Sequence, residues 1–211
     1  MLTPWLQPLP LVAILRGLTP GEAVATGRAI VEAGFRVLEV PLNSPQPFDS
    51  IALLAEALGK DVLVGAGTVM TPAQVEAVAN AGGRLIVMPH ADTVVIRAAK
   101  AAGLLCVPGV ATPTEAFAAL AAGADGLKLF PAEQSSPAVL KAWRAVLPRE
   151  VPVLPVGGIA AGNMAPWVAA GAAGFGIGSA LFAPGRTLDD TAQRARAFAQ
   201  AWHSLETRAC L

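Results

Sequence analysis

The 211-residue sequence has only two cysteines, four lysines and no long apolar segment. Cys106 lies in an apolar run and Cys210 is next to the end of the sequence, so we expect no disulfide framework. Apolar runs of about 5–8 residues are far shorter than the ~20 residues that a membrane helix needs. The beginning, MLTPWLQPLP, lacks the basic and apolar regions of a secretion signal. We therefore expect a cytoplasmic protein with no membrane partner.

The sequence also lacks an excess of either charge. Fifteen basic and fifteen acidic residues give a formal net charge of zero, and no basic block stands out, so a nucleic-acid partner is not expected. Hydrophobic residues make up 54% and charged residues 14%, which allows a large core and excludes a disordered chain. Because no linker or change of composition divides the chain, we expect one domain over residues 1–211.

Two kinds of site are missing from the pattern. No GxGxxG motif follows the first apolar run, so nothing specific indicates a dinucleotide cofactor. No predicted strand end carries clustered His, Asp or Cys at ligand spacing, so no metal is expected. We predict that the protein works without a cofactor.

What the sequence does contain is a regular alternation of strand and helix signals. Eight apolar, β-branched runs predict strands, with alanine-rich helical segments between them. These runs are residues 11–16, 36–42, 62–68, 84–89, 104–109, 126–131, 151–158 and 174–182. Eight strand–helix units predict a single (β/α)8 TIM barrel in the α/β class, and an open doubly wound sheet is the alternative.

The ends of the predicted helices carry recognisable signals. Thr19, Thr71 and Thr112 each precede a proline and stand three residues before Glu or Gln, the pattern of a capping box. Ser136-Pro137 repeats the cap without the acid. Five Ala-Gly pairs predict the helix ends, because glycine readily takes the left-handed conformation there. Their glycines are Gly34, Gly82, Gly103, Gly123 and Gly171.

One lysine lies inside a predicted strand. In GLKLFP, strand alternation places Leu127 and Leu129 toward the helices and Lys128 toward the barrel interior. Glu39 is the only one of the fifteen acidic residues inside a predicted strand, and it also faces inward. Both stand near the carboxyl ends of their strands, where barrel active sites gather.

Two interpretations of this lysine and glutamate are open. They could form a structural ion pair, although a buried pair adds little net stability. Alternatively, burial lowers the lysine pKa and leaves a neutral amine that attacks a carbonyl, while Glu39 moves protons. We favour Schiff-base chemistry with Lys128 and Glu39 as catalytic residues.

Other candidates lie at the same predicted rim. Arg16, at the end of the first strand, is either a solvated side chain or a holder of a substrate carboxylate or phosphate. Gly157-Gly158 ends the seventh predicted strand and Gly178-Ser179 lies within the eighth, and barrel phosphate sites usually come from the loops after these two strands. We predict a phosphorylated ligand there. His90 could contact substrate, but a lone histidine at such a position is more often a rim residue, and the role of His90 stays open.

Six motifs, in this order along nearly the whole chain, resemble the class I aldolases that cleave 2-keto-3-deoxy-6-phospho sugar acids. They are ILRG (14–17), LEVPLNSP (38–45), VGAGTV (64–69), LKLFPAE (127–133), PVGGI (155–159) and IGS (177–179). The resemblance implies a homotrimeric (β/α)8 enzyme that cleaves a phosphorylated keto-sugar acid to pyruvate and D-glyceraldehyde 3-phosphate.

The same resemblance assigns roles to residues. It implies that Lys128 forms the Schiff base, that Glu39 is the proton shuttle and that Thr68 helps to hold the pyruvate carboxylate. Pro89 and Phe130 match positions in the pocket wall. Gly157, Gly158 and Ser179 match the phosphate site.

Two departures resemble the phosphogalactonate branch of this family. Asn43 stands where phosphogluconate-type enzymes carry a carboxylate-binding arginine, which implies that Arg16 takes over that role. Val156 stands where those enzymes carry threonine, and loss of this hydroxyl would remove a hydrogen bond that distinguishes C4 epimers. Three alternatives remain: a phosphogluconate-type aldolase, a phosphate-binding barrel isomerase or synthase, and a non-catalytic phosphosugar-binding protein.

Overall fold

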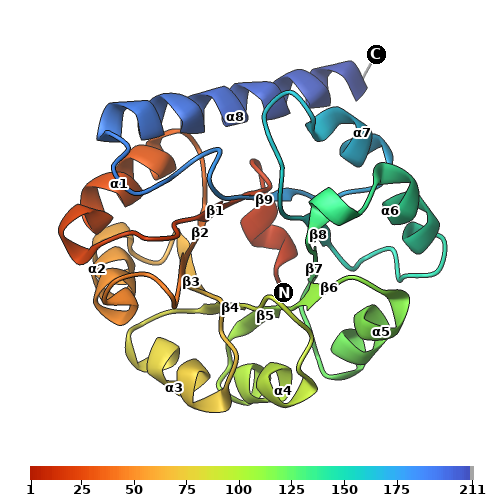
Figure 1. Cartoon of the computed structure of the whole chain (residues 1–211), viewed down its shortest axis with the longest axis horizontal. Helices are drawn as coiled ribbons and strands as arrows, with labels where there is room; N and C mark the ends of the chain where they lie inside the picture. The colour runs from red at the N-terminus through yellow and green to blue at the C-terminus, as the bar shows by residue number, and fades with distance from the viewer. Residues whose placement is uncertain (210–211) are drawn as a thin grey trace.

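The computed structural model describes residues 1–209, in which parallel strands alternate with helices (Figure 1). The strands are β1 (Leu11–Ile14), β2 (Val37–Pro41), β3 (Leu63–Gly67), β4 (Leu85–Val87), β5 (Leu105–Val107), β6 (Gly109–Val110), β7 (Leu127–Leu129), β8 (Val153–Pro155) and β9 (Phe175–Ile177). The helices are η1 (Thr3–Leu6), α1 (Pro20–Glu32), α2 (Pro47–Leu58), α3 (Pro72–Asn80), α4 (Thr93–Ala101), α5 (Pro113–Ala121), η2 (Ala132–Gln134), α6 (Pro137–Arg144), α7 (Met164–Ala169) and α8 (Leu188–Ala209). Every predicted strand segment contains a strand, and the α/β class is confirmed.

The strands form two parallel sheets that curl side by side. One has the order β5-β4-β3-β2-β1-β9 and the other the order β6-β7-β8. The predicted fifth strand is divided at Pro108, which has no N–H to donate to a neighbouring strand. At the other junction, Val156 forms a bridge with Gly176, and the Ala173 N–H donates to the Val153 carbonyl at 3.0 Å. Helices α1 to α8 surround the strands (Figure 1).

The predicted helix ends are confirmed. The hydroxyl groups of Thr71, Thr112 and Ser136 accept hydrogen bonds from backbone N–H groups three residues later. At α1 the Thr19 N–H donates to Glu22 Oε1 at 2.9 Å. These contacts pair amide groups that a helix leaves without partners in its first turn. The five expected end glycines all have positive φ: Gly34, Gly82, Gly103, Gly123 and Gly171.

Alternation along the strands separates two apolar clusters. Leu38, Leu127 and Leu129 belong to the large cluster between sheet and helices, as predicted. The inward-facing apolar side chains of several strands form a smaller cluster, which includes Val37 and Leu63. Burying one such side chain contributes about 1.5–3 kcal/mol. Buried polar side chains are therefore unusual on the inward side, and Glu39 and Lys128 are two of them.

Helix η1 covers the amino-terminal ends of the strands. Its neighbour Leu2 and its last residue, Leu6, are buried in the inner cluster. Trp5 lies close to two arginines, with the Arg36 and Arg84 guanidinium carbons 5.7 and 5.0 Å from the centre of a Trp5 ring. In Figure 1 this helix lies at the centre of the ring of strands. The carboxyl ends of the strands are left as the accessible side of the sheet.

Two observations bear on the cysteines and the membrane question. Cys106 is a buried free thiol whose Sγ lies 3.9 Å from Met88 Sδ, and burial raises its pKa to about 12. Cys210 lies outside the described residues. None of the helices described within residues 1–209 combines the length and apolar character that a membrane crossing requires.

Candidate active site

Lys128 is the central residue of β7 and is buried, with 7% of its surface exposed. Its Nζ lies 4.4 Å from the centre of the Phe130 ring. Burial lowers the pKa of Lys128, the Arg16 charge lowers it further, and the Glu39 charge opposes both effects. The result is an amine that loses its proton more readily than an exposed lysine does.

Glu39, in β2, is 2% exposed. Burial raises the pKa of its carboxyl group to about 7, against the opposing charges of Lys128 and Arg16. Its Oε2 atom has no hydrogen-bond partner within residues 1–209. A Cβ on Gly67 would collide with this carboxylate, so glycine at this position of β3 makes the space that Glu39 occupies. An unpaired buried carboxyl that titrates near neutrality is suited to proton transfer.

Lys128 and Glu39 line the same inner cavity, whose free volume is about 20 Å³. This is room for about one water molecule. No ion pair joins the two side chains within the part of the chain that the structure describes. The structural ion-pair interpretation therefore has no contact to support it.

Lys128 also faces a larger mouth pocket of about 600 Å³ at the carboxyl ends of the strands. Arg16 lies at its rim, and its Nη1 donates to Asn43 Oδ1 at 2.6 Å. The adjacent Gly17 N–H donates to Ser44 Oγ at 2.9 Å. Through these two hydrogen bonds, Asn43 and Ser44 orient the residues that follow β1. Sequence reasoning noted Asn43 only as a departure and missed Ser44.

The predicted phosphate residues Gly157, Gly158, Gly178 and Ser179 all line the mouth pocket, as do Phe130 and Val156. Gly157 and Gly158 have φ of 109° and 63°, values that side chains rarely adopt. A Cβ on Gly157 would also collide with the Glu133 carboxylate, which lines the same pocket. Sequence reasoning quoted the LKLFPAE motif but gave Glu133 no role.

Thr68 and Pro89 follow β3 and β4 but are not among the residues that line the mouth pocket. Thr68 has a positive φ of 58°, an unusual conformation for a β-branched residue that often marks a functional site. His90 is exposed. Within residues 1–209, no group of three or more His, Cys, Asp or Glu side chains is arranged to hold a metal ion.

The pKa of Glu39 predicts a pH-dependent stability. Unfolded Glu39 ionises near pH 4.5 and folded Glu39 near pH 7. The folded state binds more protons between these values, so the free energy of unfolding falls as the pH rises through this window. Relative to Glu39→Gln, we expect wild type to lose on the order of 3 kcal/mol between pH 4.5 and 7. Urea unfolding of both proteins measures this, and a constant difference would contradict it.

A lysine that burial makes easy to deprotonate, beside a carboxyl that titrates near neutrality, meets the needs of imine-forming carbon–carbon cleavage. Class I aldolases are the class of protein that this fold and this site define. The family model described as "Aldolase: KDPG and KHG aldolase" matches residues 3–195. The chain belongs to this family, and it is an aldolase, which is a carbon–carbon lyase.

Individual relatives agree with the family. The chain is 49% identical over 198 residues to the 2-dehydro-3-deoxy-6-phosphogalactonate aldolase of Escherichia coli (strain K12), covering 94% of this chain and 97% of the relative. A solved structure named "Native KDPGal structure" is 48% identical with a TM-score of 0.94, covering 96% and 98%. A KDPG aldolase from Legionella pneumophila, with pyruvate captured as a covalent carbinolamine intermediate, is 28% identical with a TM-score of 0.78, covering 93% of each chain.

Proposed function

We propose that this protein cleaves 2-dehydro-3-deoxy-6-phosphogalactonate to pyruvate and D-glyceraldehyde 3-phosphate, with Lys128 as the nucleophile. The observation that carries the proposal is the position of Lys128, whose side chain lines both the inner cavity beside Glu39 and the mouth pocket beside Arg16. The similarity to the phosphogalactonate aldolase of Escherichia coli supports this choice of substrate.

The reaction begins with the neutral amine of Lys128. It attacks the C2 carbonyl carbon, and the carbonyl oxygen takes a proton to give a carbinolamine, which loses water to form a protonated imine. When the C3–C4 bond breaks, its electron pair moves toward the imine nitrogen and leaves an enamine. The C4 hydroxyl loses its proton and becomes the aldehyde of glyceraldehyde 3-phosphate.

Glu39 handles the protons of this sequence. As a carboxylate it accepts a proton, and as a carboxylic acid it returns one to C3 of the enamine, giving the imine of pyruvate. Water then hydrolyses this imine, releases pyruvate and restores Lys128. A pKa of about 7 keeps both forms of Glu39 available near neutral pH.

The two ends of the substrate need different partners. We assign the carboxylate to Arg16 and Thr68, with Pro89 and Phe130 as pocket walls. The guanidinium of Arg16 offers a planar donor pair for a carboxylate, and its bond to Asn43 fixes its direction. The phosphate would lie against the backbone of Gly157, Gly158, Gly178 and Ser179, whose small or absent side chains let amide groups approach an anion.

We extend the proposal to the closure of the barrel, the oligomeric state and the location of the protein in the cell. The bridge between Val156 and Gly176 and the continuity of β5 with β6 through Pro108 support closure of the two sheets into one (β/α)8 barrel over a single domain, residues 1–211. By resemblance we propose a cytoplasmic homotrimer that needs no cofactor. Sedimentation equilibrium tests the trimer, and full activity after exhaustive chelation tests the absence of a metal cofactor.

The test of the proposed function is turnover of the two C4 epimers, followed through release of pyruvate. We expect kcat/KM to be higher for the phosphogalactonate epimer than for the phosphogluconate epimer. A preference for the phosphogluconate epimer would select the phosphogluconate-type alternative. Binding of both epimers without release of pyruvate would indicate a phosphosugar-binding protein.

Val156→Thr should move this preference. Val156 is 7% exposed and lines both the inner cavity and the mouth pocket. A threonine there keeps the shape and adds a hydroxyl near the position proposed for C4. One hydrogen bond contributes roughly 1 kcal/mol, so the ratio of kcat/KM values should shift toward the phosphogluconate epimer by about 5-fold. Val156→Ala, which adds no hydroxyl, is the control; an equal shift in both variants would reject this role.

A further inference from the structure

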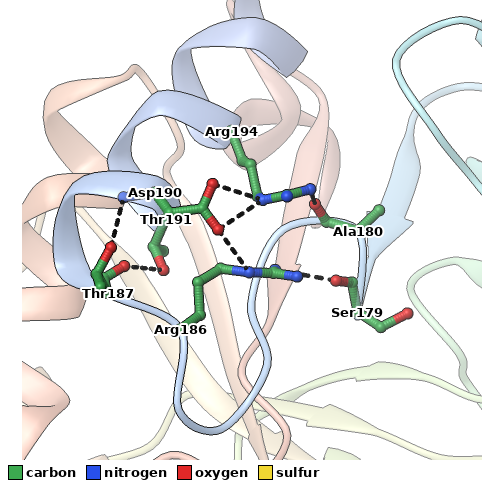
Figure 2. Close-up of polar contacts among 7 residues, drawn as sticks. All are labelled: Ser179, Ala180, Arg186, Thr187, Asp190, Thr191 and Arg194. Carbon is green, nitrogen blue, oxygen red and sulfur yellow. Dashed lines mark hydrogen bonds and ion pairs between the residues drawn. The ribbon is translucent and has the colours of Figure 1, made fainter.

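The segment between β9 and α8 combines a wall of the mouth pocket with a compact charged cluster. Ser179, Ala180 and Pro184 line the mouth pocket. Behind them lie Arg186 and, in α8, Asp190 and Arg194, and we call these three residues the guanidinium cluster. Figure 2 shows both arginines reaching toward the segment, with Asp190 between them.

The guanidinium cluster holds two consecutive carbonyl groups of the segment. Arg186 Nη1 donates to the Ser179 carbonyl at 3.0 Å, and Arg194 Nη1 donates to the Ala180 carbonyl at 3.3 Å. Asp190 joins the two arginines, since each Nε lies 3.0 Å from one of its carboxylate oxygens. Arg186 is 17% exposed at its side chain and Arg194 is 43% exposed. The hydrogen bond from Arg186 to the Ser179 carbonyl is therefore better shielded from solvent than the bond from Arg194 to the Ala180 carbonyl.

The direction of the Ser179 carbonyl fixes the direction of the next amide group. A trans peptide is planar, so its C=O and N–H groups point in opposite directions. When Arg186 holds the Ser179 carbonyl on the side of α8, the Ala180 N–H must point away from the guanidinium cluster. Within residues 1–209, the N–H groups of Ser179 and Ala180 donate to no acceptor. Ala180 itself lines the mouth pocket.

We propose that the guanidinium cluster is a positioning device for phosphate recognition: Arg186, held by Asp190, orients the Ser179–Ala180 peptide so that its N–H binds the phosphate of the substrate. Arg186 acts through the backbone and is a positioning residue. The inference rests on the proposed function, because it needs a phosphorylated substrate at this pocket. It adds residues that lie behind the predicted phosphate site and do not line the pocket.

A simpler explanation is that Arg186 attracts phosphate through its charge alone. The two explanations predict different changes of KM for the phosphorylated substrate in Asp190→Asn. Removing the Asp190 charge makes the surroundings more positive, so charge attraction predicts an unchanged or lower KM for the phosphorylated substrate. Positioning predicts a higher KM, because both guanidinium groups lose their anchor. Arg186→Lys separates the explanations further, since lysine keeps the charge and loses the planar donor fork.

The experiment measures the reverse, aldol-forming reaction with pyruvate and two acceptors, D-glyceraldehyde 3-phosphate and D-glyceraldehyde. For Arg186→Met and Asp190→Asn we expect KM for the phosphorylated acceptor to rise about 10-fold or more, the effect of one lost hydrogen bond to a charged group. KM for D-glyceraldehyde and for pyruvate should stay within about 2-fold, as should kcat. Arg196→Met, at an exposed arginine of α8 outside the guanidinium cluster, is the control.

Each other outcome overturns a specific statement. Equal losses with both acceptors would mean that the guanidinium cluster only stabilises the fold, and thermal unfolding of the variants would show this. A lower KM for Asp190→Asn would leave charge attraction as the explanation. If wild type itself did not prefer the phosphorylated acceptor, the phosphate site of the proposed function would fail together with this inference.

Discussion

Lys128→Arg is expected to lose both aldol cleavage and covalent trapping of pyruvate. Arginine keeps a positive charge at the site but does not lose its proton at usable pH, so it cannot attack a carbonyl. Loss of a catalytic nucleophile costs on the order of 10⁴-fold or more in kcat. Lys128 is the only lysine among the residues that line the inner cavity and the mouth pocket, so no other amine there can replace it.

The measurement is borohydride reduction in the presence of pyruvate, followed by peptide mass spectrometry. Wild type should carry one reduced pyruvate adduct on Lys128, and Lys128→Arg should carry none. Lys100→Arg and Lys141→Arg are matched controls that should keep both the adduct and the activity. An adduct on Lys100 or Lys141, or an unmodified wild-type protein, would remove the proposed mechanism.

Glu39→Gln is expected to separate the two halves of the chemistry. The amide keeps the size of the carboxyl group but cannot shuttle a proton, so exchange of the pyruvate methyl hydrogens with solvent should slow by about 10²-fold or more. Adduct formation on Lys128 should persist, because the amine itself is intact. Removing the Glu39 charge also removes the one effect that opposes the low pKa of Lys128, so the amine should deprotonate at still lower pH.

Proton NMR of pyruvate in deuterated buffer measures the exchange, and the borohydride assay measures the adduct in parallel. Glu39→Asp is the informative companion, because it keeps a carboxyl group on a shorter side chain and should retain part of the exchange. If Glu39→Gln exchanged the methyl hydrogens at the wild-type rate, Glu39 would have no part in proton transfer.

Much of the fold could be predicted because its signals are local. A threonine before a proline, with an acid or amide three residues later, defines a capping box without any knowledge of distant residues, and Thr71 and Thr112 behave accordingly. The inward positions of Lys128 and Glu39 follow from strand alternation alone. The break in the fifth strand at Pro108 has an equally local cause, although the sequence interpretation treated that segment as one strand.

Other features depend on contacts that no local pattern contains. Arg186 and Asp190 read as ordinary surface charges at the start of a helix, and only the fold brings them to the carbonyl of Ser179. The Glu133 carboxylate approaches Gly157 from η2. The sequence interpretation also left the ion pair between Lys128 and Glu39 open, since residue types alone do not say whether two inward charges touch.

Helix η1 has a consequence for the order of events in turnover. Leu2 and Leu6 are buried in the inner cluster, so we expect ligands of Lys128 to enter and leave through the mouth pocket. Under the proposed mechanism, pyruvate bound to Lys128 would then lie deeper in the pocket than the aldehyde fragment. We therefore expect the phosphorylated fragment to depart first and pyruvate second, and in synthesis we expect pyruvate to bind before its partner. Product-inhibition patterns should follow this sequence.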